Sequence, residues 1–330
     1  MRSRLSRSTD SAEEKTNGGD WDELRDLSTL AAAGQARGLG RANDVPGAAG
    51  ARVRVEGKLF ARGQERLAVR GVTYGPFAPT GDGEPFPSPL AMAEDFSRMR
   101  AAGLNAVRTY HLPPDRLFDA AAAQGVSVFV DVPWPRHVCF LDSAEVRREA
   151  RSLVRKAAER GRSHPALFAR SIGNEIPASI VRWHGARRVE RFLAELADVA
   201  RQADPDGLVT YASYPSTEYL DLAFLDFVTF NVYLHDPTAF RRYLFRLQNL
   251  VGDQPLVLGE LGMDTLRHGE PEQARHLARQ VREAGLMGLA GTFVFSWTDD
   301  WHTGGHPIED WAFGPALRRQ SSEILVSFGI

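Results

Sequence analysis

The chain has 330 residues, of which 43% are hydrophobic and 25% are charged, a composition that excludes a wholly disordered protein. Forty basic residues against forty-two acidic ones give a net charge of −2, so no global field recruits nucleic acid or an anionic membrane. No apolar run reaches the ~18–20 residues of a membrane helix, and the charged start lacks the apolar core of a signal peptide. We therefore expect a cytoplasmic protein, unless the chain is a fragment of a larger membrane-associated protein.

Cys139 is the single cysteine, which excludes internal disulfides and Cys-built zinc sites and fits a reducing compartment. The sequence offers no identifiable base partner for its thiol, so we expect it to be inert. His302 and His306 are four residues apart, but the two glycines between them argue against a helix, and no third metal ligand is implied. We therefore expect neither a metal nor a cofactor.

Residues 1–50 differ from the rest of the chain. They hold one aromatic residue, Trp21, among many serines, glycines and alanines, and cannot bury enough surface to order themselves. The alternative is one short docked helix, because Trp21 and the leucines at 24, 27 and 30 recur every three residues. We therefore divide the chain into a disordered or loosely docked leader over 1–50 and a folded domain over 51–330.

The folded domain begins with the signature of a β-hairpin. The sequence over 53–71 alternates and turns at Gly57 and Gly63, and it then enters a buried strand. Short continuous apolar runs follow, as is typical of strands that are covered on both faces. These runs occupy residues 67–74, 105–110, 126–132, 167–175, 208–214, 226–233, 255–260 and 291–297.

Helical stretches with clear starts and stops lie between these runs. One begins at Ser88-Pro89 and stops at Gly103, and the next begins at Pro113-Pro114 and stops at Gly125. Strands that alternate with helices argue for parallel βαβ units. For the about 280 residues after the leader, an α/β fold closed as a (β/α)8 TIM barrel with a short N-terminal hairpin fits best. The open doubly wound sheet is less favoured, because its dinucleotide-binding fingerprint is missing.

Functional side chains of such barrels gather at the carboxyl ends of the strands. Two glutamates, Glu175 and Glu260, end the fourth and seventh predicted strands. There they face each other across the barrel mouth, as a two-carboxylate glycosidase requires. The alternative interpretation is a pair of buried, salt-bridged structural carboxylates. The other polar and aromatic residues at strand ends are Tyr74, Arg108, Tyr110, His111, Asp131, Trp134, Asn174, Asn231, Tyr233, Trp297, Asp299 and Asp300.

Four short motifs resemble the clan A glycoside hydrolases: GNE at 173–175, GE at 259–260, FNVY at 230–233 and SW at 296–297. Within the clan, the segments RGVTYGPF, NAVRTYH, HPALFARSIGNE and WTDDW…EDWAFG are similar to the barrel of glycoside hydrolase family 2. The stretch from GVTYGPF to VSVFVDVPW is also similar to the β-1,3-glucan-processing families 17 and 72. The resemblance covers roughly residues 65–315.

This resemblance implies a role for each matching residue. Glu175 would be the general acid/base and Glu260 the nucleophile. Arg108 would be the charge partner of Glu260, Tyr233 would hydrogen-bond to it, and Asn174 would bond the sugar 2-hydroxyl. Arg108 could instead belong to a barrel-mouth ion pair, and the aromatic residues could belong to the core. The other predicted substrate-binding residues are Trp297 as the floor of the reacting sugar's subsite, His111, and, from their place after strands, Trp134 and Asp299.

The chemistry of a retaining glycosidase agrees with these roles. It needs one carboxyl that starts protonated and one that starts ionised, about 5–5.5 Å apart. Burial without an obvious cation would raise the pKa of Glu175 toward ~6–7, whereas an arginine and a phenol favour the ionised form of Glu260. We therefore predict a retaining β-glycoside hydrolase that acts on a β-linked glycan, a β-glucan, by double displacement.

Two alternatives share the same barrel. A transglycosylase would use the same residues but would pass the sugar to an acceptor that outcompetes water. A catalytically silent carbohydrate-binding module of a polysaccharide synthase is the other, although the presence of both glutamates counts against it. The leader is too short and too polar for the β-sandwich domains that usually precede family 2 barrels. Similar barrels accompany glycosyltransferases of bacterial polysaccharide synthesis, so the expected partners are an oligo- or polysaccharide and such a glycosyltransferase.

Overall fold

The computed structural model describes residues 51–298 except 78–79 and 82, and the short segments 302–303 and 306–307. These residues all belong to one compact unit, Gly47–Ile330. The leader with its candidate helix, and the strand-end residues Asp299 and Asp300, lie outside the described residues.

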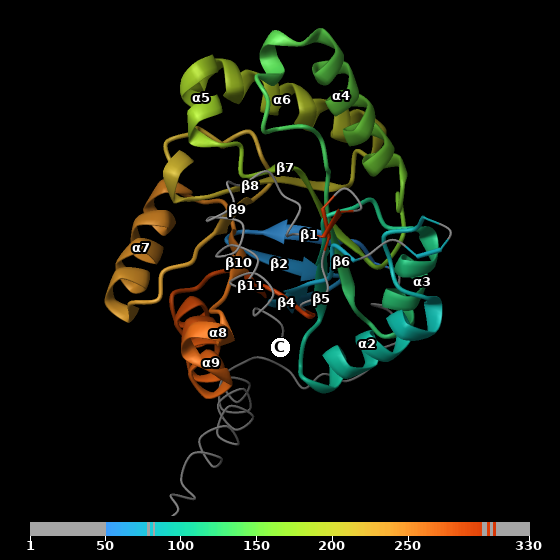
Figure 1. Ribbon diagram of the computed structural model, residues 1–330, viewed down its shortest axis with the longest axis vertical. Coiled ribbons are helices and arrows are strands. Elements are labelled where there is room, and N and C mark those ends of the chain that lie inside the picture. Colours follow the sequence, from blue (N-terminus) through green and yellow to red (C-terminus); the bar gives the residue numbers. More distant parts are fainter. Residues whose placement is uncertain (1–50, 78–79, 82, 299–301, 304–305, 308–330) are drawn as a thin grey trace, which may run out of the picture. The chain divides into compact units, whose positions relative to one another are not determined.

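Eight strands form a closed barrel in which each strand lies parallel to its neighbours (Figure 1). The last of these eight strands pairs with the first, with Gly291 opposite Val69, so the barrel has no free edge. The predicted (β/α)8 architecture is confirmed. In chain order the barrel strands are β4 (Val69–Thr73), β5 (Ala106–Thr109), β6 (Ser127–Asp131), β7 (Leu167–Asn174), β8 (Leu208–Ser213), β9 (Val228–Asn231), β10 (Leu256–Leu261) and β11 (Gly291–Val294).

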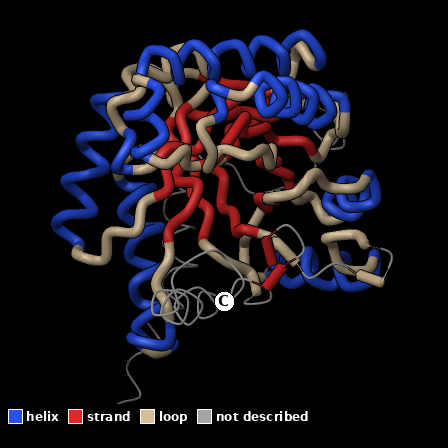
Figure 2. The backbone as a smooth tube through the Cα atoms, turned by 45° about the horizontal axis from the view of Figure 1, so that its top comes forward, coloured by secondary structure: helices blue, strands red, loops and turns tan. Residues whose placement is uncertain are grey.

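Helices surround the barrel and cover the outer faces of its strands (Figure 2). Several begin as the sequence predicts: the hydroxyl of Ser88 accepts a hydrogen bond from the amide of Ala91, with Pro89 in the first turn. Within the described part of the chain, no helix has the length and apolarity needed to cross a membrane. The helices are α2 (Pro89–Ala101), α3 (Asp115–Ala123), η1 (Phe140–Asp142), α4 (Ala144–Glu159), α5 (Ala178–His184), α6 (Ala186–Ala203), η2 (Pro215–Thr217), α7 (Pro237–Leu250), α8 (Thr265–His268) and α9 (Glu270–Leu286).

The predicted hairpin is a three-stranded antiparallel sheet of β1 (Val53–Glu56), β2 (Leu59–Arg62) and β3 (Glu65–Leu67). Phe60 from its middle strand is fully buried, with its ring edge-on to Phe168 at 4.9 Å and to Phe227 at 5.1 Å. Phe168 and Phe227 lie at the amino ends of β7 and β9. The sheet therefore closes the amino end of the barrel and leaves the carboxyl end for a site.

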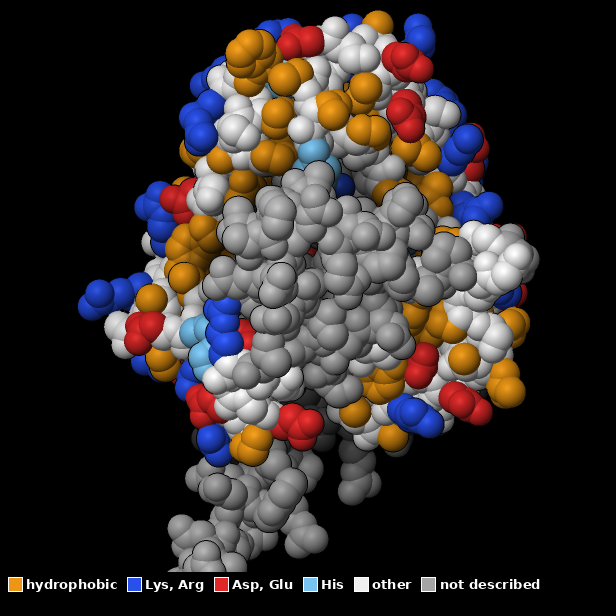
Figure 3. Space-filling model, in the orientation of Figure 1, with side chains coloured by type: hydrophobic (Ala, Val, Ile, Leu, Met, Phe, Trp, Pro, Cys, Tyr) orange, Lys and Arg blue, Asp and Glu red, His pale blue; other side chains and the backbone are white. Residues whose placement is uncertain are grey.

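A further short strand pair, β12 (His302–Thr303) and β13 (His306–Pro307), is antiparallel. This agrees with the expectation that the glycines between His302 and His306 argue against a helix. On the face shown in Figure 3, basic and acidic side chains are interspersed around the described rim, in keeping with the near-zero net charge.

Candidate active site

Glu260 lies near the carboxyl end of β10, where the pairing with β9 is irregular. The register shifts between Leu258 and Glu260, and such irregularities at barrel rims re-aim side chains. Glu260 is buried, and each of its oxygens has a phenol donor. The hydroxyl of Tyr110 donates to Oε1 at 2.6 Å and that of Tyr233 donates to Oε2 at 2.9 Å. The predicted contact with Tyr233 is present, and Tyr110 is a second one that the sequence did not indicate.

Arg108, on β5, is fully buried and connects several strand ends. Its Nη1 donates to Glu260 Oε1 at 3.3 Å and to the carbonyl of Gly259 at 2.7 Å. Its Nε donates to Asp131 Oδ2 at 2.5 Å, and its Nη2 donates to Asn174 Oδ1 at 3.0 Å. Burial alone would lower the pKa of Arg108, but the charge of Asp131, with Tyr110 and Glu260, outweighs burial and raises it. The guanidinium is therefore a permanent cation beside Glu260.

Gly259 makes room for this guanidinium. A Cβ atom at this position would lie 2.7 Å from Arg108 Nη1, 2.9 Å from Asn231 Oδ1 and 2.5 Å from Thr229 Cγ2. Contacts this short are not tolerated, so no larger residue fits without displacing the arginine or the asparagine. In the Gly259-Glu260 pair, the glycine therefore provides the space for Arg108 and the glutamate provides the reactive carboxyl.

Glu175 follows β7 directly, in an unusual backbone conformation. Its φ is +49°, which non-glycine residues adopt rarely and mostly at functional sites. Its amide donates to the carbonyl of Ala212 at 2.9 Å, and Asn231 Nδ2 donates to its Oε1 at 2.9 Å. The structure thus turns this carboxyl toward the residues that end β9.

The environment of Glu175 favours a proton on its carboxyl. Burial and then the charge of Glu260 raise the pKa of Glu175 to about 7. The hydrogen bond from Asn231 and the charges of Arg108 and Arg136 act in the opposite direction without cancelling the rise. The predicted direction is therefore reproduced, although two arginines lie closer than the sequence indicated.

Asn231 connects Glu175 with Arg108, the cation beside Glu260, through short polar contacts. Besides its bond to Glu175, its Nδ2 donates to Asn174 Oδ1 at 2.9 Å, and its Oδ1 accepts from Arg108 Nη1 at 3.1 Å. The sequence placed Asn231 at a strand end but gave it no role. The FNVY motif, with Asn231 two residues before Tyr233, was the signal that could have identified it. Asn174 Oδ1 accepts from Asn231 Nδ2 and from Arg108 Nη2, which leaves the amide nitrogen of Asn174 as the group that could reach a sugar hydroxyl.

The other predicted substrate-binding residues are placed as follows. Tyr233 donates its hydroxyl to Glu260 and has 38% of its surface exposed. Trp297 is half-buried, and its amide donates to the carbonyl of Thr73, which ends β4. His111 is also half-buried, and burial lowers its pKa, so it is neutral at neutral pH. Asp299 lies outside the described residues.

Trp134 does not lie in the site, and the prediction for it is corrected here. Its indole is 3% exposed and donates from Nε1 to the carbonyl of Ile172 at 2.7 Å. Its ring meets Phe140 and Phe192 edge-on, at 5.0 Å and 6.0 Å. A side chain enclosed in this way has no free face for a sugar. Sequence position after a strand did not reveal that the ring turns back into the core.

The fold and these contacts define a class of protein: a closed parallel (β/α)8 barrel with two glutamates, on its fourth and seventh strands, at the carboxyl end. Residues 53–304 match the family described as glycosyl hydrolases family 2, TIM barrel domain. The chain belongs to this family.

Solved structures of similar fold include β-glucuronidases. That of Ruminococcus gnavus in complex with uronic deoxynojirimycin has a TM-score of 0.67 and 18% identity, over 77% of this chain and 47% of that one. The β-glucuronidase of Bifidobacterium dentium complexed with coumarin-3-O-glucuronide has a TM-score of 0.67 and 19% identity, and the match covers 77% of this chain and 44% of that one. At these identities, the similarity shows a shared fold.

A sequence relative is the 1,3-beta-glucanosyltransferase gel2 of Aspergillus fumigatus. It is 28% identical over 137 residues, which are 38% of this chain and 29% of the relative. This chain therefore spans less than half the length of the proteins that it matches.

Proposed function

We propose that the chain hydrolyses β-glycosidic bonds with retention of configuration, with Glu260 as nucleophile and Glu175 as acid/base. The observation that carries this proposal is the contrast between the two carboxyls. Glu175 has a pKa raised to about 7, so about half of the molecules carry its proton at pH 7 and most carry it below that pH. Glu260 receives hydrogen bonds from Arg108, Tyr110 and Tyr233, all of which favour a carboxylate. One group starts protonated and the other ionised, as double displacement requires.

In the first half-reaction, a carboxylate oxygen of Glu260 attacks the anomeric carbon while Glu175 gives its proton to the glycosidic oxygen. The carbon–oxygen bond to the leaving group breaks, and the leaving group departs as an alcohol. Esterification removes the charge of Glu260, which is one of the two causes that raise the pKa of Glu175. Glu175 is then a stronger acid and stays ionised, so it can take a proton from the water that opens the ester.

The substrate in this proposal is a β-linked glycan, and specifically a β-glucan. The glucanosyltransferase relative carries a 1,3-β-glucan activity in its name, and the barrel neighbours are named for β-glucuronides. Tyr233, whose hydroxyl contacts Glu260, is 38% exposed and supplies an aromatic face beside this glutamate, and such faces suit the carbon skeleton of a sugar ring.

Transglycosylation is the second candidate, and the match to glucanosyltransferases is the observation that favours it. The two reactions share their first half and differ only in whether water or a sugar hydroxyl accepts the glycosyl group.

Product size separates these candidates. The full chain is incubated with β-1,2, β-1,3, β-1,4 and β-1,6 glucans and with aryl β-glycosides, and the products are resolved by length. Shorter products indicate hydrolysis and longer ones indicate transfer. Glu260→Ala serves as the blank. The absence of any product together with retained glycan binding would overturn the proposal in favour of a binding module.

A further inference from the structure

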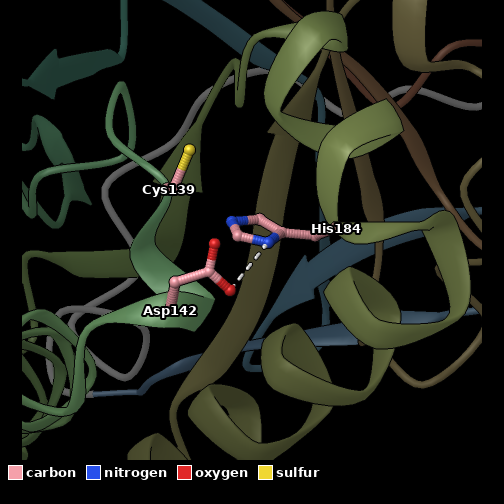
Figure 4. A group of neighbouring side chains, drawn as sticks. All are labelled: Cys139, Asp142 and His184. Atoms are coloured by element: carbon pink, nitrogen blue, oxygen red, sulfur yellow. Dashed lines mark ion pairs between the residues drawn. The ribbon is translucent and has the colours of Figure 1, made fainter.

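Three side chains with metal-binding chemistry converge beside the barrel mouth: Cys139, Asp142 and His184 (Figure 4). One candidate ligand atom from each lies within 4.8 Å of the other two. Within the described part of the chain, no other group of three such residues converges so closely. Cys139 precedes η1 and Asp142 ends it, in the segment after β6, and His184 ends α5.

His184 is the fixed member of the group. Its side chain is fully buried, and its ring lies edge-on to Phe140 at 5.0 Å. Its Nδ1 lies 3.8 Å from Asp142 Oδ1, which is too far for a hydrogen bond, and it has no hydrogen-bond partner among the described residues. Buried nitrogens are rarely left unpartnered in proteins. This atom is therefore aimed at a ligand that would satisfy it.

The two ring nitrogens of His184 differ in their contacts. Nε2 accepts a long bond of 3.4 Å from the amide of Leu141. A metal on Nδ1 requires the proton on Nε2, so binding would exchange the long contact with the Leu141 amide for a coordinate bond at the other ring nitrogen.

A supporting contact orients the carboxylate of Asp142. Trp183 Nε1 donates to its Oδ2 at 2.8 Å, which leaves Oδ1 as the oxygen that faces His184. Ligating carboxylates in metal sites are commonly held by such a second hydrogen bond.

From this geometry we propose that Cys139, Asp142 and His184 Nδ1 bind a zinc ion, with water as the fourth ligand. A thiolate, an imidazole and a carboxylate form a ligand set that suits zinc better than magnesium or calcium. Tetrahedral zinc places nitrogen and oxygen ligands about 3.4 Å apart, so the observed 3.8 Å needs an adjustment of a few tenths of an ångström. Cys139 Sγ lies within 4.8 Å of the other two ligand atoms and must approach by up to about 1 Å for the same geometry. The half-exposed side chain of Asp142 and the exposed Cys139 are free to move by these amounts.

The ion would connect two loops of the barrel mouth. The loop after β6 follows Asp131, which holds Arg108, and α5 follows Glu175 after two residues. A zinc ion would therefore link the segment that follows Asp131 to the segment that follows Glu175. It is independent of the reaction that this site performs.

The test uses Co²⁺ and Zn²⁺ salts alone with the reduced full chain. Cobalt bound by a thiolate shows a sulfur-to-metal charge-transfer absorption that histidine and carboxylate sites lack. We expect this band to saturate at one Co²⁺ per chain and to vanish when Zn²⁺ is added. The thiol gives up its proton, so proton release should accompany binding, and zinc should raise the melting temperature by mass action.

Surface variants identify the ligands without disturbing the buried histidine. Cys139→Ser should abolish the band, and Asp142→Asn should weaken cobalt binding at least about tenfold. Trp183→Phe removes only the hydrogen bond to Asp142 and should weaken cobalt binding about 10–100-fold. Each variant should melt within a degree or two of the parent in the absence of metal, because its side chain is exposed.

A second histidine group provides the matched control. His235 lies 5.7 Å from His268 and 4.9 Å from His276, ring to ring, and the group contains no cysteine. His268→Gln should leave the charge-transfer band intact. The proposal is overturned if the parent shows no thiolate band or if Cys139→Ser retains that band. It is also overturned if zinc no longer raises the melting temperature of His268→Gln but still raises that of Cys139→Ser.

Discussion

Glu260 and Glu175 differ in what their oxygens contact. Glu260 has an arginine and two phenol donors around it, whereas the carboxyl of Glu175 accepts a hydrogen bond from the neutral amide of Asn231. The same stretch of barrel rim therefore prepares one carboxyl to attack and the other to carry a proton. This difference leads to predictions about each residue separately.

Chemical rescue by azide tests the two roles. In Glu260→Ala, azide should occupy the vacated face, attack the sugar directly and yield the α-glycosyl azide. In Glu175→Ala, the ester on Glu260 still forms from an aryl glycoside, and azide should then displace it to give the β-glycosyl azide. Nuclear magnetic resonance of the isolated products distinguishes the anomers. Exchanged anomers would mean that the two roles are reversed, and undiminished turnover in both variants would exclude the two-carboxylate mechanism.

The raised pKa of Glu175 predicts a pH profile. General acid catalysis needs the protonated form, so kcat/KM should fall as the pH rises through about 7. Burial and then Glu260 raise this pKa, so Glu260→Gln should lower it. Carbon NMR titration of the Glu175 carboxyl in this inactive variant measures the shift directly. An unchanged titration would show that the two carboxyls do not interact.

The same group makes stability depend on pH. The folded state holds a proton on Glu175 up to about pH 7, whereas the ordinary value for glutamate is 4.5. The folded state therefore binds more protons than the unfolded state in this window, and this contribution to stability is lost as the pH rises from about 4.5 to about 7. Denaturant unfolding of Glu175→Gln against the parent should show a smaller loss across that range.

Single residues mark the limit of what the sequence predicted about the site. Strand-end position identified Glu175, Glu260 and Arg108, because the carboxyl ends of barrel strands meet at one place. Asn231 was visible at a strand end without a role, since its bonds depend on side-chain orientation. The ring of Trp134 points into the core, and a pattern of residue types does not encode that direction. Cys139 had no visible partner because His184 is distant in sequence and adjacent only in the fold.

Among the elements, β7 and β10 carry the glutamates, and both are irregular near their carboxyl ends. The pairing of β7 with β8 shifts between Ser171 and Asn174, and that of β10 with β9 shifts between Leu258 and Glu260. Apolar runs and helix stops predicted the strands themselves. The shifts were not predictable, because they depend on pairing partners rather than on local propensity.

Two glycine-to-alanine substitutions test whether Gly259 is needed for the close packing of Arg108 and Asn231. Gly259→Ala pushes a methyl group against Arg108 and Asn231, so both stability and kcat should fall, with overpacking worth about 1–3 kcal/mol. Gly285 lies in α9 with nothing within 4 Å of a Cβ, so Gly285→Ala should raise stability by about 0.5–1 kcal/mol and leave kcat unchanged. Urea unfolding and steady-state kinetics measure both. Equal effects of the two substitutions would remove the steric argument for Gly259.

The whole molecule keeps stability and chemistry at opposite ends of the barrel. The three-stranded sheet fills the amino end through Phe60, and the glutamates occupy the carboxyl end. Phe60→Ala should therefore cost about 3–5 kcal/mol of unfolding free energy, the usual result of emptying an aromatic core position. The folded fraction should keep the parent kcat/KM, measured well below the lowered melting temperature. A loss of kcat/KM in the folded protein would show that the two ends are coupled.

The boundary at residue 50 makes the last prediction about the whole molecule. The barrel closes through β4 and β11, and its amino end is sealed by β1–β3, all of which follow residue 50. Arg52 also lies after this boundary, and its Nη1 pairs with Asp204 Oδ1 at 2.7 Å. A chain beginning at residue 51 should therefore keep the parent melting temperature and glycosidase activity. A chain beginning at residue 69 loses Phe60 and Arg52 together and should melt far lower, as calorimetry would measure. If both truncated chains lose stability equally, residues 1–50 contribute to the fold and the boundary is wrong.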